Sequence, residues 1–168
     1  MKITCHWTAG TYTPSLLDKE HYHYIVGYKD NKPFIVKGRY AVEDNFNCSD
    51  GRYAAHCGGG NTNNIGIAVA CMHGYKSPQQ QGDYPMKQAQ FEKMCRLVAE
   101  VAHKYNIPID KDHVFTHYEF GKAHPTTSSA GKIDITFLPF EPTKKANEIG
   151  NYIRNKAQVY YNRLYGNI

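Results

Sequence analysis

The sequence predicts one α/β domain, spanning residues 1–168, in which a central mixed β-sheet is flanked by helices. Residues 65–71 are almost entirely apolar, as a strand buried on both faces would be. Residues 85–105 place apolar side chains at the helical period, which indicates a long amphipathic helix. Strand and helix patterns alternate along a chain whose length suits one domain.

The first part of the chain predicts three short strands and one short helix. Residues 2–6 form a first strand, and residues 15–20 follow a proline, which favours a helix start. Residues 21–28 alternate along their length, which is typical of a strand. The polar residues 29–32 form a hairpin turn into a strand at 33–37.

The second part predicts the long helix and one further strand. Glycine and asparagine make 38–63 a loop before the apolar central strand begins. The helix at 85–105 stops at the Asn-Ile-Pro sequence of 106–108. Residues 113–117 form the next strand, and we expect 120–131 to be an irregular loop.

The last segment, 143–168, is predicted to be a basic amphipathic helix that belongs to the same domain. It carries most of the chain's net charge of +5, because five basic residues face Glu148 as the one acidic residue. Such a helix favours an anionic surface of the cell envelope or a membrane. The alternative is a solvated helix face with a purely structural role. The basic residues are Lys144, Lys145, Arg154, Lys156 and Arg163.

Cysteine usage and the amino terminus bear on location. Five cysteines without a CxxC pair suggest a reducing compartment, although Cys48 and Cys57 leave a disulfide open. The first residues contain no apolar leader, and no stretch is long enough to span a bilayer. We therefore expect a protein that is made in the cytoplasm without a signal peptide. We also expect it to be a monomer.

Two histidines and a carboxylate predict a metal site. His6 and His117 each stand at the end of a predicted strand, where open sheets usually bind their ligands. Asp134 follows His117 after a long loop, and His124 inside that loop is the rival third ligand. A catalytic zinc site takes three protein ligands and leaves a fourth position for water. The pattern therefore predicts a zinc-dependent hydrolase with one Zn²⁺.

Two further side chains are candidates for assisting the reaction. If residues 132–134 are extended, Lys132 and Asp134 point to the same side, and the lysine faces the oxyanion that forms on attack. Tyr22, near the start of a predicted strand, is placed to donate a proton or orient water.

These residues lie in a series of short motifs that together resemble a known family. In order, the motifs are HWTAG (6–10), HYHYIV (21–26), AHCGG (55–59), NTNNIGI (61–67), HYE (117–119) and KID (132–134). The series is similar to the zinc-dependent N-acetylmuramoyl-L-alanine amidases of type 2. Those enzymes share their fold with phage amidase endolysins and peptidoglycan recognition proteins.

The resemblance implies a reaction and a set of roles. The expected activity is hydrolysis of the amide between N-acetylmuramic acid and L-alanine of peptidoglycan. His6, His117 and Asp134 match the zinc ligands, and Tyr22 and Lys132 match the catalytic assistants. The resemblance also implies that His56 and Asn64 line the substrate groove.

The implied partner is peptidoglycan, as glycan strand plus stem peptide, rather than nucleic acid. The expected role is that of a phage or prophage endolysin, bacteriolytic and antimicrobial, which acts on the cell wall after release or export. Two alternatives stay open: a module that binds peptidoglycan without cutting it, and an amidase that recycles soluble muropeptides.

The chain also departs from the family pattern. The separation between His117 and Asp134 is longer than usual, and the family's Pro-Gly after the third ligand is absent. Ala68 stands where some relatives use a glutamate, which favours the branch that uses a tyrosine. No cysteine follows Cys95, so the cysteine that some relatives use as third ligand is excluded.

Overall fold

A five-stranded sheet forms the centre of the molecule in the computed structural model, which describes residues 1–166. The strands are β1 (Lys2–Trp7), β2 (Tyr24–Lys29), β3 (Lys32–Lys37), β4 (Asn64–Val69) and β5 (Val114–Thr116). The helices are α1 (Leu16–His21), α2 (Gln88–Tyr105), α3 (His117–Ala123) and α4 (Ala146–Tyr165), together with a 3₁₀ turn η1 (Val42–Phe46).

The sheet has the strand order β3-β2-β4-β1-β5 and is mixed. β1 runs parallel to both β4 and β5, and β4 runs parallel to β2. β2 and β3 form an antiparallel hairpin at one edge. Every residue of β4 is buried, as expected for the apolar central strand. The predicted mixed α/β sheet flanked by helices is therefore confirmed.

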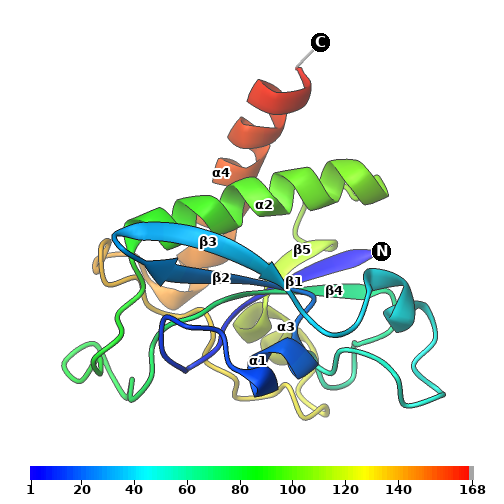
Figure 1. The fold of residues 1–168 in the computed structure, drawn as a ribbon, viewed down its shortest axis with the longest axis horizontal. Helices are drawn as coiled ribbons and strands as arrows, with labels where there is room; N and C mark the ends of the chain where they lie inside the picture. The colour runs from blue at the N-terminus through cyan, green and yellow to red at the C-terminus, as the bar shows by residue number, and fades with distance from the viewer. Residues whose placement is uncertain (167–168) are drawn as a thin grey trace.

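The helices lie on both faces of the sheet (Figure 1): α2 and α4 cover one face, and the short helices α1 and α3 lie against the other. Alternation along β1 separates the two environments. Ile3, Cys5 and Trp7 belong to the apolar core under α2, whereas Thr4 and His6 point to the opposite face. Polar residues that face away from the main core are therefore collected beside α1 and α3.

The region around the first helix differs from the prediction. β2 begins at Tyr24 rather than at residue 21, because α1 continues to His21. A capping box starts this helix: the Ser15 hydroxyl accepts from the Asp18 amide at 3.0 Å, and the Asp18 carboxylate accepts from the Ser15 amide at 2.9 Å. The predicted short helix is thus present, and Tyr22 lies between helix and strand.

The long helix ends where the sequence predicts. Asn106 adopts a left-handed conformation, with φ of 55°, and its amide donates to the Ala102 carbonyl.

None of the helices among residues 1–166 is both long and apolar enough to cross a membrane. Cys48 and Cys57 are free thiols, so the disulfide that the sequence left open is not formed.

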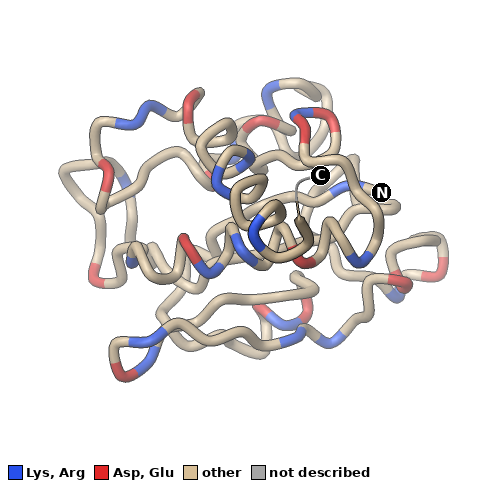
Figure 2. The backbone as a smooth tube through the Cα atoms, turned by 90° about the horizontal axis from the view of Figure 1, so that it is seen from above, with Lys and Arg blue, Asp and Glu red and all other residues tan. Residues whose placement is uncertain are grey.

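The basic helix α4 uses part of its charge inside the molecule. Arg154 pairs with Glu119 at 2.9 Å, and Lys156 pairs with Glu92 at 2.6 Å. Figure 2 shows basic and acidic residues interspersed along the rest of the backbone. Residues 167–168, which the predicted helix included, lie outside the described part of the chain. Contact with an anionic surface stays a prediction.

A buried histidine beside the sheet makes stability depend on pH. His23 is 2% exposed; its Nδ1 accepts from the Gly66 amide at 2.9 Å, and its Nε2 donates to Asn45 at 2.9 Å. Burial lowers the pKa of His23, and the bond to Asn45 opposes this only in part. Below the unfolded pKa of about 6.5 the unfolded chain therefore binds more protons, so stability falls as pH falls.

We expect His23→Gln to weaken this dependence. In urea unfolding with a chelator present, the free energy of unfolding of the wild type should decrease from pH 7.5 to 5.5 more than that of the variant. The variant is expected to be less stable at pH 7.5, because the Gly66 amide loses its acceptor. Equal decreases in the two proteins would contradict the assignment of this titration to His23.

Candidate metal centre

His6 is presented by the central strand β1. It lies on the polar face of that strand and is 1% exposed, so its ring is fixed among neighbouring side chains. The His6 ring contacts the rings of Tyr22, His56 and His117, with centroids 5.1, 5.1 and 4.7 Å away. The sequence correctly predicts that a strand end carries this residue.

His117 directly follows β5 and opens α3, where the sequence predicts an irregular loop from residue 120. That prediction is wrong for residues 120–123 and holds for 124–131, which form neither helix nor strand. A capping box begins the helix: the Thr116 hydroxyl accepts from the Glu119 amide at 3.1 Å, and Glu119 accepts from the Thr116 amide at 3.0 Å. The Thr-x-x-Glu spacing of this box is the sequence signal that would have identified the helix. The change of direction turns the His117 side chain toward β1.

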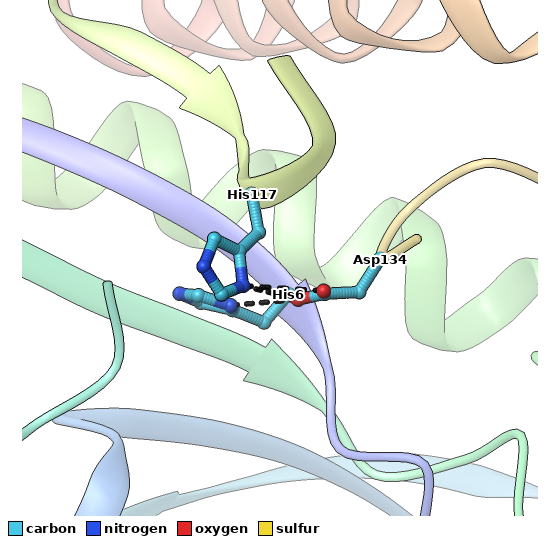
Figure 3. A group of neighbouring side chains, drawn as sticks. All are labelled: His6, His117 and Asp134. Atoms are coloured by element: carbon cyan, nitrogen blue, oxygen red, sulfur yellow. Dashed lines mark hydrogen bonds and ion pairs between the residues drawn. The ribbon is translucent and has the colours of Figure 1, made fainter. Parts of the chain in front are cut away.

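Asp134 comes from the loop that follows α3. Its backbone carbonyl accepts from the Tyr118 amide at 2.8 Å, which fixes the loop against the start of the helix. One carboxylate oxygen, Oδ2, lies 2.7 Å from His6 Nδ1 and 3.3 Å from His117 Nδ1. Figure 3 shows the three side chains converging from β1, α3 and the loop. Their ligand atoms lie within 4.8 Å of one another, so the group could hold a metal ion.

The protonation of this group suits a cation. Burial lowers the pKa of His6, and the adjacent Asp134 carboxylate opposes that effect without cancelling it. Burial would raise the pKa of Asp134, but the close contact of its carboxylate with His117 and His6 holds that pKa below the usual range. A neutral imidazole and an ionised carboxylate are the forms that bind metals.

The hydrogen bonds behind His6 test whether the group fits a metal. His56 Nε2 lies 2.9 Å from the Asn64 carbonyl, which can only accept, so this nitrogen carries a proton. His56 Nδ1 must then accept from His6 Nε2, 3.0 Å away. The remaining nitrogen of a neutral His6, Nδ1, directs a lone pair at the Asp134 carboxylate. Two electron-rich groups that face each other are stabilised by a cation bound to both, and a divalent metal fits this donor set.

A cleft of about 540 Å³ opens beside this group of side chains. Tyr22 and Lys132 line it, as do the candidate ligands His117 and Asp134. The fold therefore brings both predicted catalytic assistants, Tyr22 and Lys132, to the cleft, although residues 132–134 form no strand. Its other lining residues are Trp7, Thr8, Ala9, His21, Ala55, His56, Met72, Tyr75, Gly131 and Ile133.

The structure separates His124 from the site. His124 ends α3, and its Nδ1 bonds to the Phe120 carbonyl at 3.0 Å. It lines two other cavities and none of the cleft over His6. Among the two alternatives for the third ligand, the geometry therefore favours Asp134.

The expectation that Asn64 lines the substrate groove is wrong. Asn64 is 1% exposed and absent from the residues around the cleft. Its side chain accepts from the Thr4 hydroxyl at 2.8 Å and donates to the Gly60 carbonyl at 2.8 Å, so it holds β1 and the 56–63 loop together. His56 does border the cleft, but its hydrogen bonds run inward to His6 and Asn64.

Two cleft residues escaped the sequence analysis. Met72 and Tyr75 reach the cleft from the turn after β4. Tyr75 also contacts Trp7 edge-on, with ring centroids 5.1 Å apart. No periodicity extends into this turn, so only its path in space places the two side chains.

Comparison with known proteins identifies one matching family model. A family model described as N-acetylmuramoyl-L-alanine amidase matches residues 2–132, which include His6 and His117 but stop short of Asp134. No curated protein matches the chain.

A solved complex of the N-acetylmuramyl-L-alanine amidase AmiD from E. coli, with the substrate anhydro-N-acetylmuramic acid-L-Ala-D-gamma-Glu-L-Lys, is similar to the chain at 20% identity and a TM-score of 0.47. The similarity covers 69% of this chain and 47% of that one, so the chain spans about half the length of AmiD. The family match extends over most of the described sheet and both histidines, and the chain belongs to the N-acetylmuramoyl-L-alanine amidase family.

Proposed function

We propose that this protein is a zinc-dependent amidase that hydrolyses the bond between the lactyl group of N-acetylmuramic acid and L-alanine of peptidoglycan. The observation that carries the proposal is the convergence of His6, His117 and Asp134 beside a cleft that His117 and Asp134 line. Membership of the amidase family supports the bond assignment. The donor set of two imidazoles and one carboxylate supports zinc, with a coordination position left for chemistry.

Zinc held by these three residues would polarise the amide carbonyl and make a water molecule more acidic. The protein supplies the surroundings. The cleft wall places Tyr22 beside His6, with ring centroids 5.1 Å apart. Burial and the nearby charge of Asp134 raise the pKa of Tyr22, so the phenol keeps its proton at neutral pH. Tyr22 is thus a hydrogen-bond donor toward an oxygen that becomes negative during attack.

Lys132 adds positive charge to the cleft. Its side chain is exposed at the rim, and Asp134 is the one acidic residue among those that line the cleft. An ammonium group at this place favours a substrate oxygen that gains negative charge. The stem peptide and the leaving amine would then lie along the open side of the cleft.

We expect Tyr22→Phe to lower kcat by about 100-fold, the usual cost of removing one donor to a developing oxyanion. Zinc content and KM should change little, because the phenyl ring still packs against His6. Tyr75→Phe is the matched control, since Tyr75 lines the same cleft from another loop. Steady-state kinetics on a soluble muropeptide, together with metal analysis, would check both variants. Equal losses in the two variants would contradict the role of Tyr22.

The proposed function is tested with purified sacculi and with soluble anhydro-muropeptides. Release of free stem peptides from sacculi, identified by mass, supports the wall-lytic activity, which the further proposal of a phage or prophage endolysin requires. Cleavage of soluble fragments alone would identify a recycling amidase instead. If the protein binds sacculi but cleaves neither substrate, whether or not a chelator is present, it is a recognition module. Lysis of outer-membrane-stripped cells would test the bacteriolytic and antimicrobial role, and light scattering the monomer.

A further inference from the structure

Ser129 is a buried hydroxyl in a turn whose neighbours are exposed. It is 0% exposed, whereas Ser128 and Ala130 on either side face solvent. The turn lies in the segment between His117 and Asp134, and the sequence analysis assigned Ser129 no role. A buried hydroxyl costs free energy unless it is hydrogen-bonded, so its partners show what it does.

The partners of Ser129 fix the direction of a hydrogen-bond chain. Its Oγ lies 2.8 Å from the Gly58 carbonyl, which can only accept, so the hydroxyl donates there. The same Oγ lies 3.0 Å from His117 Nε2 and is left to accept from it. Cys57 Sγ, at 3.9 Å, adds a weak contact. His117 Nε2 therefore carries a proton, and the Nδ1 lone pair faces Asp134.

The chain on both sides of Ser129 is shaped to hold it there. A side chain at Gly121 would collide with the Ser129 carbonyl oxygen, so glycine at this position lets the turn pack against α3. The Lys132 amide donates to the same carbonyl at 3.2 Å. These contacts come from the helix that begins with one candidate ligand and from the loop that carries another.

The Gly58 carbonyl, which accepts from Ser129, lies in a loop that is also fixed by hydrogen bonds. Asn61 Oδ1 accepts from the His56 amide at 3.0 Å and the Cys57 amide at 2.8 Å, which braces the loop just before Gly58. The same loop carries His56, which bonds to His6 Nε2. Both metal-binding histidines are therefore oriented from one short, braced segment.

We propose that Ser129 is the positioning residue for His117: it fixes the ring orientation and the Nε2–H tautomer so that Nδ1 is presented to the metal. This inference rests on the proposed function, because it assigns Ser129 a task toward the zinc ion. Such hydrogen bonds to the distal nitrogen of a ligating histidine typically account for 10–100-fold in metal affinity. Ser129→Ala removes the acceptor and leaves the loop's backbone contacts in place.

The test compares Ser129→Ala with Ser128→Ala, an adjacent and exposed serine of the same turn. Zinc dissociation constants are measured by competition with a chromogenic chelator, after circular dichroism confirms the fold of each metal-free variant. We expect zinc binding to weaken by about 10-fold or more in Ser129→Ala and to stay at the wild-type value in Ser128→Ala. Equally tight binding by the wild type and Ser129→Ala would overturn the inference.

A second readout uses the wild type and so does not depend on how the variants fold. Long-range ¹H–¹⁵N spectra of the zinc-loaded protein, with His117 assigned by comparison with His117→Gln, report which ring nitrogen carries the proton. A protonated Nε2 that donates to Ser129 supports the proposal; a protonated Nδ1 overturns it. If the wild type binds no zinc at all, the proposed function itself fails. If the wild type and Ser129→Ala bind zinc equally tightly, only the inference about Ser129 fails.

Discussion

Replacement of Asp134 by alanine is expected to abolish tight zinc binding and amidase activity. Asp134 supplies the one carboxylate of the cluster, with Oδ2 2.7 Å from His6 Nδ1. Loss of a direct ligand should exceed the 10–100-fold cost of losing an indirect contact, so we expect zinc affinity to fall by more than about 100-fold. Metal analysis after dialysis and the release of stem peptides from sacculi would measure both effects.

His124→Ala is the matched control for this prediction, since His124 is the rival ligand in the sequence. Its Nδ1 bonds to the Phe120 carbonyl at the end of α3, away from the cleft. We expect this variant to bind zinc and cleave substrate like the wild type. Retention of zinc by Asp134→Ala together with loss in His124→Ala would reverse the assignment of the third ligand.

The largest expected loss of stability comes from Arg154→Met. Arg154 is buried on α4 and donates to both carboxylate oxygens of Glu119 at 2.9 Å, to the Val114 carbonyl at 2.8 Å and to Asn151 at 2.7 Å. Methionine would leave the Glu119 carboxylate, whose side chain is 26% exposed, without its cationic partner. Breaking such a pair costs about 3 kcal/mol or more, which urea unfolding at a fixed zinc concentration would measure.

Arg96→Met provides the comparison. Arg96 pairs with Glu100 at 3.8 Å, and both side chains are about half exposed, so water and salt screen their attraction. The expected loss is below about 1 kcal/mol. If both variants unfolded at the same urea concentration, the prediction that the Arg154–Glu119 pair contributes more to stability than the exposed Arg96–Glu100 pair would be wrong. Glu119 also caps the helix that starts with His117, so its pair with Arg154 joins α4 to the helix that carries this candidate ligand.

Local patterns predicted the elements well where one signal dominated. The apolar run of β4 and the helical period of α2 define their elements independently of the rest of the chain. Prediction was wrong where two signals competed. The segment from residue 21 alternates like a strand, but the capping box at Ser15 carries α1 through His21. The Thr116 capping box likewise begins a helix that includes residues 120–123, which were predicted to be part of a loop.

The candidate site was predictable in part. Strand ends meet at one edge of a sheet, so His6 and His117 could be paired from their positions alone. Asn64 belongs to a strand in the same motif series, yet its side chain joins β1 to a loop instead of lining the cleft. Whether such a residue faces substrate or the interior depends on the path of the loop packed over it.

The sequence by itself determined the class of fold, the order of the elements and the two histidines, because strand period, helical period and capping act over a few residues. Only the tertiary structure brings Asp134, and not His124, beside the two histidines and places Ser129 behind His117. Those choices depend on contacts between distant segments, such as the Tyr118 amide on the Asp134 carbonyl and the Ser129 hydroxyl on the Gly58 carbonyl. No pattern along the chain encodes such contacts, since loop paths follow from the packing of the whole molecule.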